Sequence, residues 1–166
     1  RVGPLRNTGA ALSPFNAFLI LQGIQTLHVR MDRHCENTQK LAEYLEAHDS
    51  VKWVKYGGLL SSPYNELSNK YTNGKPSGIL SFGIKGGKES GITFIDSLNL
   101  ITRLVNIGDT KSLATHPAST THSQLDESDF ESAGISSDMI RISVGIENID
   151  DIIADVDQAI LESQAY

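Results

Sequence analysis

The chain has 166 residues, of which 39% are hydrophobic and 20% charged, as in an ordinary folded domain. Its net charge is −6, with acidic and basic residues interspersed, which argues against a surface for nucleic acid or anionic membranes. No apolar run approaches the roughly 20 residues of a membrane span. The single cysteine, Cys35, excludes an intrachain disulfide and favours a reducing, cytoplasmic location. Because Cys35 falls in an expected helix, we interpret it as a packed side chain rather than a reactive thiol.

The first third of the chain predicts a long helix. The chain begins at Arg1 without an initiator methionine, which we interpret as sequence from within a longer protein. Ser13 and Pro14 indicate a helix start, because serine caps the first turn and proline suits the first helical position. Apolar residues then recur at three- and four-residue steps over residues 14–47. Residues 15–21 are apolar on nearly every side, which predicts that something beyond this domain buries that end.

The rest of the chain predicts short strands between helices. Strands are expected at residues 51–56, 79–84, 103–105 and 140–144, with helices at 89–99 and from Asn148 onward. Short helical turns are expected near residues 64–70 and 126–133. Residues 106–122 are so rich in polar side chains that we expect a loop outside the core, forming part of a binding site. This order predicts an α+β domain of two layers, in which helices cover a small sheet.

Arg141 is the strongest candidate for a residue that binds an anionic ligand. It lies between Ile140 and Ile142 on a strand whose other face is expected to be core. Its guanidinium group suits a carboxylate or phosphate held by two parallel hydrogen bonds. The alternative is an exposed strand arginine that makes a surface ion pair.

Other polar patterns are weaker. His116 and His122 are six residues apart with no nearby acidic or cysteine ligand, so a metal site is not expected. The glycines at 83, 86 and 87 match no phosphate-loop or dinucleotide fingerprint. Residues 108–112 could form an anion-binding nest, although an ordinary turn suits the same sequence. No lysine, serine or cysteine stands in a setting that marks a nucleophile.

Several stretches resemble the Cys/Met-metabolism family of pyridoxal-phosphate enzymes. They are residues 12–19 (LSPFNAFL), 22–31 (QGIQTLHVRM), 108–109 (GD), 116–122 (HPASTTH) and 141–147 (RISVGIE). The resemblance covers nearly the whole chain with its motifs in order. It implies the C-terminal domain of a fold type I enzyme, with a small, mostly antiparallel sheet. Residues 1–48 would be the end of the large domain and the connecting helix, and residues 49–166 the C-terminal domain.

Within the family, residues 106–113 (NIGDTKSL) and 82–87 (FGIKGG) are most similar to the O-acetylhomoserine sulfhydrylases, or homocysteine synthases. The lyases generally carry Ser-Leu-Gly at 106–108. The resemblance implies a homotetrameric transferase of methionine biosynthesis and transsulfuration. With pyridoxal phosphate as electron sink, it would replace the acetoxy group of O-acetylhomoserine with sulfide. A γ-lyase or a cystathionine γ-synthase of the same family, and a non-catalytic amino-acid-binding domain, are the alternatives.

The resemblance also implies roles for three residues. Arg141 would hold the substrate α-carboxylate, Asn106 would lie beside it in place of the lyases' serine, and Thr121 would line the same pocket. The family's Schiff-base lysine, in a Ser-x-Thr-Lys stretch, has no match in this chain. Neither do the groups that bind the cofactor ring and phosphate. The resemblance therefore implies no catalytic, cofactor-binding or metal residue here, and the chain alone is expected to be inactive.

Overall fold

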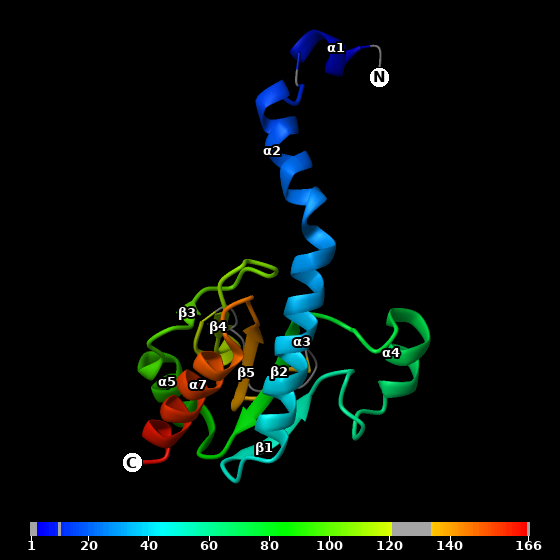
Figure 1. Ribbon diagram of the computed structural model, residues 1–166. Helices are drawn as coiled ribbons and strands as arrows, with labels where there is room; N and C mark the ends of the chain where they lie inside the picture. The colour runs from blue at the N-terminus through cyan, green and yellow to red at the C-terminus, as the bar shows by residue number, and fades with distance from the viewer. Residues whose placement is uncertain (1–2, 10, 121–133, 166) are drawn as a thin grey trace. The chain divides into compact units, whose positions relative to one another are not determined.

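The structure is a computed structural model that describes residues 3–9, 11–120 and 134–165 (Figure 1). It consists of two compact units, Arg1–Arg30 and Met31–Tyr166. None of the helices in the described ranges is long and apolar enough to cross a membrane. The boundary expected at residue 48 concerns the domains of a longer protein and stays a prediction. Within this chain, the compact units divide eighteen residues earlier.

The expected single helix over 14–47 is wrong, because the structure has two helices there. α2 spans Pro14–Gln25 and α3 spans Leu27–Glu46, preceded by a short α1 at Pro4–Thr8. Ser13 caps α2 as predicted, and its side chain accepts a hydrogen bond from the Asn16 amide. Thr26 interrupts the helical path with φ −106° and ψ 4°. The Arg30 guanidinium donates to the Gly23 carbonyl at 3.0 Å and to the Thr26 hydroxyl at 2.5 Å, so a side chain supplies hydrogen bonds at the interruption.

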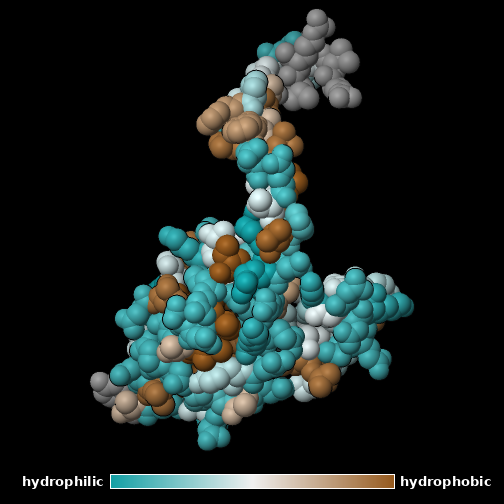
Figure 2. Space-filling model, in the orientation of Figure 1, coloured by the Kyte–Doolittle hydropathy of each residue, from teal (hydrophilic) through white to brown (hydrophobic). Residues whose placement is uncertain are grey.

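The helix α2 carries exposed apolar side chains. No residue of this helix is buried, and Phe15 and Phe18 are 67% and 54% exposed. In Figure 2 the hydrophobic colour gathers along this helix. Exposed apolar area of this kind marks an interaction surface. The exposure agrees with the expectation that a partner outside the described residues would cover residues 15–21.

Among the residues that the structure describes in the second unit, five strands form one sheet, in the order β1-β2-β5-β4-β3. Neighbouring strands are antiparallel, except β3 and β4, which are parallel. The strands are β1 Val51–Lys55, β2 Ile79–Ile84, β3 Thr102–Arg103, β4 Leu113–Thr115 and β5 Met139–Ser143. The other elements are α4 Asn65–Thr72, α5 Gly87–Ser97, a 3-10 turn at Pro117–Ser119 and α7 Ile149–Ser163.

Most predicted elements are confirmed within a few residues. The strand over 79–84 matches β2, and Asn148 caps α7 by accepting a hydrogen bond from the Asp150 amide at 3.1 Å. β3 lies one residue earlier than predicted and is shorter, while α5 begins and ends two residues earlier. The helical turn expected over 126–133 lies outside the described residues.

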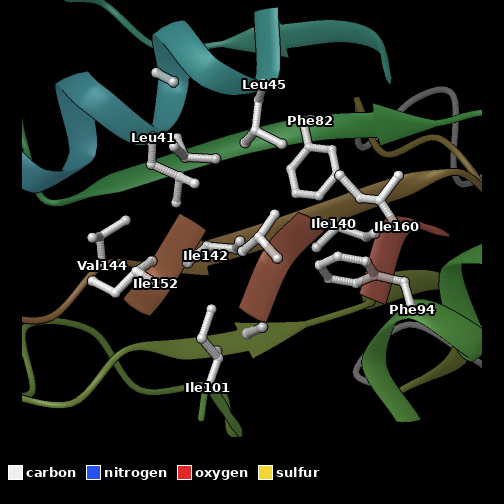
Figure 3. Close-up of a cluster of buried hydrophobic side chains, with 14 of the residues drawn as sticks. Leu41, Leu45, Phe82, Phe94, Ile101, Ile140, Ile142, Val144, Ile152 and Ile160 are labelled. Atoms are coloured by element: carbon white, nitrogen blue, oxygen red, sulfur yellow. The ribbon is translucent and has the colours of Figure 1, made fainter. Parts of the chain in front are cut away.

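The core lies between the sheet and the second half of α3, α5 and α7. Leu41, Phe82, Phe94, Ile142 and Ile160 are all fully buried in one cluster (Figure 3). The rings of Phe82 and Phe94 meet edge to face, with centroids 5.6 Å apart. Large apolar side chains from helices and sheet thus fill one shared core, which confirms the predicted two-layer α+β fold.

Candidate functional site

Arg141 lies in β5, a central strand of the sheet. Its register partners are Ser81 in β2 and Thr115 in β4. The neighbouring Ile140 and Ile142 are fully buried, while Arg141 is half-buried, so the predicted alternation of β5 is confirmed. The guanidinium Nη2 donates to the Val105 carbonyl at 2.5 Å. Among the described residues Arg141 makes no ion pair, so the surface-pair alternative has no support there.

The bond to Val105 brings Arg141 beside the backbone that leads into Asn106. Asn106 is exposed, and the chain then turns through Gly108, whose φ is +78°. The Gly108 amide donates to the Ser143 hydroxyl at 3.1 Å, two residues along β5 from Arg141. Two of the three predicted substrate-binding residues are therefore brought together. Thr121, the third, lies outside the described residues.

Residues 108–112 form an ordinary turn. The Asp109 carboxylate accepts a hydrogen bond from the Lys111 amide at 3.2 Å, which is the geometry of an Asx turn. The Ser112 amide donates to Glu147 Oε1 at 2.6 Å. Because the chain's own carboxylates occupy these two amides, the turn interpretation is favoured over the anion nest.

The expectation that residues 106–122 lie outside the core is wrong for residues 112–118. β4 is a fully buried strand between β5 and β3, and Ser112–Ala118 are buried throughout. Polar side chains are tolerated in the interior when their hydrogen bonds are satisfied. Ser112 bonds to the Glu147 carboxylate, and the hydroxyls of Thr115 and Thr120 lie 3.1 Å apart.

His116 is a packed histidine with both ring nitrogens engaged. Nδ1 lies 2.8 Å from the Ser119 hydroxyl and Nε2 lies 2.8 Å from the Ser137 carbonyl. Burial lowers the pKa of His116, which favours the neutral ring. Gly91 makes room for this ring, since a Cβ there would lie 2.6 Å from Nε2. No group of metal-binding side chains is found in the described ranges, and His122 lies outside them.

Two of the three glycines considered as a phosphate loop have structural roles. A Cβ at Gly83 would lie 2.1 Å from the Trp53 indole nitrogen, so this glycine lets the ring pack against β2. Gly86 has φ +95° and caps the start of α5. Neither backbone position needs a ligand to explain it.

Cys35 is a buried thiol, as interpreted from its place in a helix. Burial raises its pKa, partly opposed by the charge of Lys75. The thiolate is the reactive form, and a raised pKa leaves less of it at any given pH. We therefore expect iodoacetamide to alkylate Cys35 at least about tenfold more slowly than glutathione at pH 8. Mass spectrometry over time measures this rate. Alkylation in urea, where burial is lost, is the control, and equal native and urea rates would contradict a buried thiol.

The chain matches the family model described as Cys/Met metabolism PLP-dependent enzyme over residues 3–161. The chain belongs to this family. It is 48% identical over 160 residues to O-acetyl-L-homoserine sulfhydrylase 1 of Thermus thermophilus, covering 96% of this chain and 38% of the relative. It is 46% identical over 156 residues to L-methionine gamma-lyase of Pseudomonas putida, covering 94% of this chain and 39% of that relative.

A solved structure from this family has the same fold. It is the crystal structure of a putative O-acetylhomoserine (thiol)-lyase from Campylobacter jejuni, with a TM-score of 0.86 and 46% identity. The match covers 96% of this chain and 38% of that one, which contains a pyridoxyl-lysine phosphate group. The chain thus spans under two-fifths of the length of these relatives.

The lysines of this chain do not fit attachment of pyridoxal phosphate. All eight are exposed, whereas a lysine that forms a Schiff base is activated by a desolvated or cationic setting. Lys40, Lys52 and Lys75 are also held in ion pairs with carboxylates. The described residues therefore supply no setting for the cofactor's lysine.

Sequence reasoning missed Glu147 as a residue of this region. It appeared only within the motif at 141–147, with no role of its own. The signal that could have found it is the spacing, because Ser143, Gly145 and Glu147 follow Arg141 at steps of two. Each of these three residues has a hydrogen bond to Gly108 or Ser112 in the preceding turn.

Proposed function

We propose that this chain is the part of a pyridoxal-phosphate-dependent O-acetylhomoserine sulfhydrylase that binds the substrate carboxylate. The observation that carries the proposal is Arg141, half-buried on β5, with its guanidinium beside the backbone of Asn106. The planar guanidinium group of Arg141, held by one backbone carbonyl, is oriented to bind a carboxylate through two parallel hydrogen bonds. Thr121, which lies outside the described residues, would line the same pocket.

The reaction would exchange two bonds at the substrate γ-carbon. The C–O bond to the acetoxy group breaks and acetate leaves with its electron pair, while sulfide forms the new C–S bond of homocysteine. In this chain, Arg141 would bind and orient the amino acid. The cofactor, its lysine and the sulfide site would lie in the rest of the protein, which we propose to be a cytoplasmic homotetramer.

Asn106 favours a sulfhydrylase over a lyase. Identity to the two kinds of relative is nearly equal, at 48% and 46%, so it separates them weakly. The amide side chain of Asn106 has no hydroxyl with which to copy the serine that lyases generally carry there. Its exposed backbone can still face a substrate.

The full-length protein tests this function directly. We expect homocysteine to form from O-acetylhomoserine only when sulfide is added, measured by thiol chromatography, with little 2-oxoacid released from methionine. Release of 2-oxoacid faster than formation of homocysteine would instead assign a γ-lyase. Formation of cystathionine from added cysteine would assign a cystathionine γ-synthase.

The chain alone should be inactive, because its exposed lysines cannot supply the cofactor site. We add pyridoxal phosphate to residues 1–166 and compare its absorption spectrum with that of the cofactor mixed with free lysine. We expect no additional band. The control is the full-length protein, where such a band should appear. Calorimetry of the chain with O-acetylhomoserine tests the remaining alternative: tight binding that Arg141→Ala abolishes would support a free-standing amino-acid-binding domain.

A further inference from the structure

Alternate residues of β5 and its continuation contact one loop. Arg141, Ser143, Gly145 and Glu147 are spaced by two, and each has a hydrogen bond to residues 105–112, which we call the 105–112 loop. Residues two apart in an extended chain share a side, so such a series can run along a neighbouring segment. The loop contains Asn106 of the proposed site.

The start of the loop is fastened at two points. Arg141 donates to the Val105 carbonyl, and the Ser143 hydroxyl accepts from the Gly108 amide at 3.1 Å. Asn106 lies between these two attachment points. Its backbone position is therefore set by β5.

The end of the loop is fastened more densely. The Ser112 hydroxyl accepts from the Gly145 amide at 2.8 Å and donates to Glu147 Oε2 at 2.9 Å, while the Ser112 amide donates to Oε1 at 2.6 Å. The Ile146 amide donates to the Thr110 carbonyl at 2.9 Å. A Cβ at Gly145 would lie 2.5 Å from that carbonyl, so only glycine lets the two segments approach this closely.

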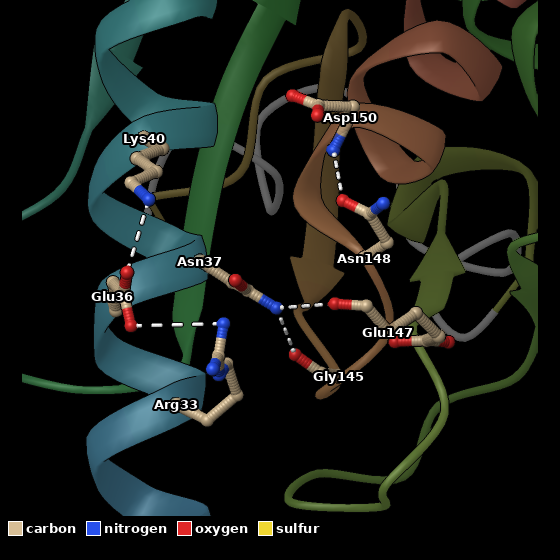
Figure 4. Close-up of polar contacts among 8 residues, drawn as sticks. All are labelled: Arg33, Glu36, Asn37, Lys40, Gly145, Glu147, Asn148 and Asp150. Carbon is tan, nitrogen blue, oxygen red and sulfur yellow. Dashed lines mark hydrogen bonds and ion pairs between the residues drawn. The ribbon is translucent and has the colours of Figure 1, made fainter.

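The turn that carries Glu147 is itself held from the opposite side. Asn37 of α3 is fully buried, and its amide donates to the carbonyls of Gly145 and Glu147 at 3.0 Å each (Figure 4). His34 Nδ1 lies 2.6 Å from the Val144 carbonyl. The Glu147 carboxylate is therefore presented from a rigid turn.

We propose that Glu147 is a positioning residue for the carboxylate site, an inference that rests on the proposed function. Its two bonds to Ser112 hold the end of the 105–112 loop. The loop in turn holds the Val105 carbonyl, which orients the Arg141 guanidinium. Without Glu147, the loop loses the two charge-assisted hydrogen bonds that fasten its Ser112 end, and such bonds are roughly twice as strong as neutral ones. Substrate binding weakens because the guanidinium is less well oriented.

The test uses the full-length protein with Glu147→Ala and Glu147→Gln. We expect Glu147→Ala to raise the KM for O-acetylhomoserine about tenfold at saturating sulfide, with kcat within about threefold. Glu147→Gln keeps one acceptor for the Ser112 amide and should restore most of this loss. The matched control is Glu162→Ala, an exposed glutamate of α7 that should leave both constants unchanged. Hydrogen–deuterium exchange of the peptide covering residues 104–113 should rise in Glu147→Ala.

The outcomes separate the two proposals. An active wild-type protein with unchanged KM and unchanged loop exchange in Glu147→Ala overturns the positioning role. A lower kcat at constant KM overturns it as well. If the wild-type protein makes no homocysteine, the proposed function fails instead, and the exchange measurement still decides whether Glu147 fastens the loop. Should Glu147→Ala fail to fold, Ser112→Ala replaces it, with a rise in KM expected and an unchanged KM overturning the proposal.

Discussion

Replacing Arg141 by alanine in the full-length protein should lower kcat/KM for O-acetylhomoserine by at least about 100-fold. A charge-assisted hydrogen bond contributes about 1.5–3 kcal/mol, and a bidentate pair supplies two. A loss of about 3 kcal/mol corresponds to roughly 150-fold. The loss should appear mainly in KM, because the guanidinium binds the carboxylate both before and during the reaction. Steady-state kinetics at saturating sulfide measures it.

A second variant separates the planar geometry of the guanidinium group from its charge, and a third is the control. Arg141→Lys keeps a positive charge but cannot make the planar bidentate contact, so it should recover only part of the loss. Arg103→Ala removes an exposed arginine of β3 that pairs with Asp96 at 3.4 Å, and should be near neutral. Equal kcat/KM for Arg141→Ala and Arg103→Ala would refute a substrate-binding role for Arg141.

The regular elements of the second unit could be predicted because their patterns are local. β2 and α7 begin where the alternation and the Asn148 cap indicate. The alternation at Ile140, Arg141 and Ile142 correctly separates the core side from the other side. These features depend on spacing along the chain alone.

β4 could not be predicted, because its burial depends on residues far away in sequence. A segment with Ser112, Thr115 and His116 has the composition of a loop. In the fold, Glu147 and Ser137 supply hydrogen-bond partners from other elements, and the buried strand becomes stable. The site that the polar pattern indicates stays a prediction, and the expectation that residues 112–118 lie outside the core was wrong because they are buried.

The break at Thr26 was missed for a similar reason. The apolar steps of three and four residues continue across it, so periodicity alone predicts one helix. The interruption depends on the backbone of Thr26 and on the hydrogen bonds from the Arg30 side chain. The spacing of apolar residues cannot predict such a contact.

Asp155 is a second residue whose importance only the fold reveals. It lies on the buried side of α7, where an acid is unexpected, and is 6% exposed. Its carboxylate accepts from three consecutive amides of the connection between α5 and β3, those of Asn99, Leu100 and Ile101, at 2.8, 3.0 and 2.9 Å. A carboxylate that caps three amides both satisfies them and fixes the path of the chain into β3.

Asp155→Ala should therefore lower the free energy of unfolding by about 4 kcal/mol, because one buried and two part-buried amides lose a charged acceptor. Urea denaturation of residues 1–166, followed by circular dichroism, measures the change. Asp155→Asn keeps one carbonyl acceptor and should cost roughly half as much. Asp151→Ala is the matched control in the same helix: this exposed acid lies in the first turn, where its interaction with the helix dipole is worth about 0.3–1 kcal/mol. A loss for Asp155→Ala no larger than that for Asp151→Ala would show that water replaces the carboxylate at little cost, and that the path into β3 is fixed by the burial of Ile101 instead.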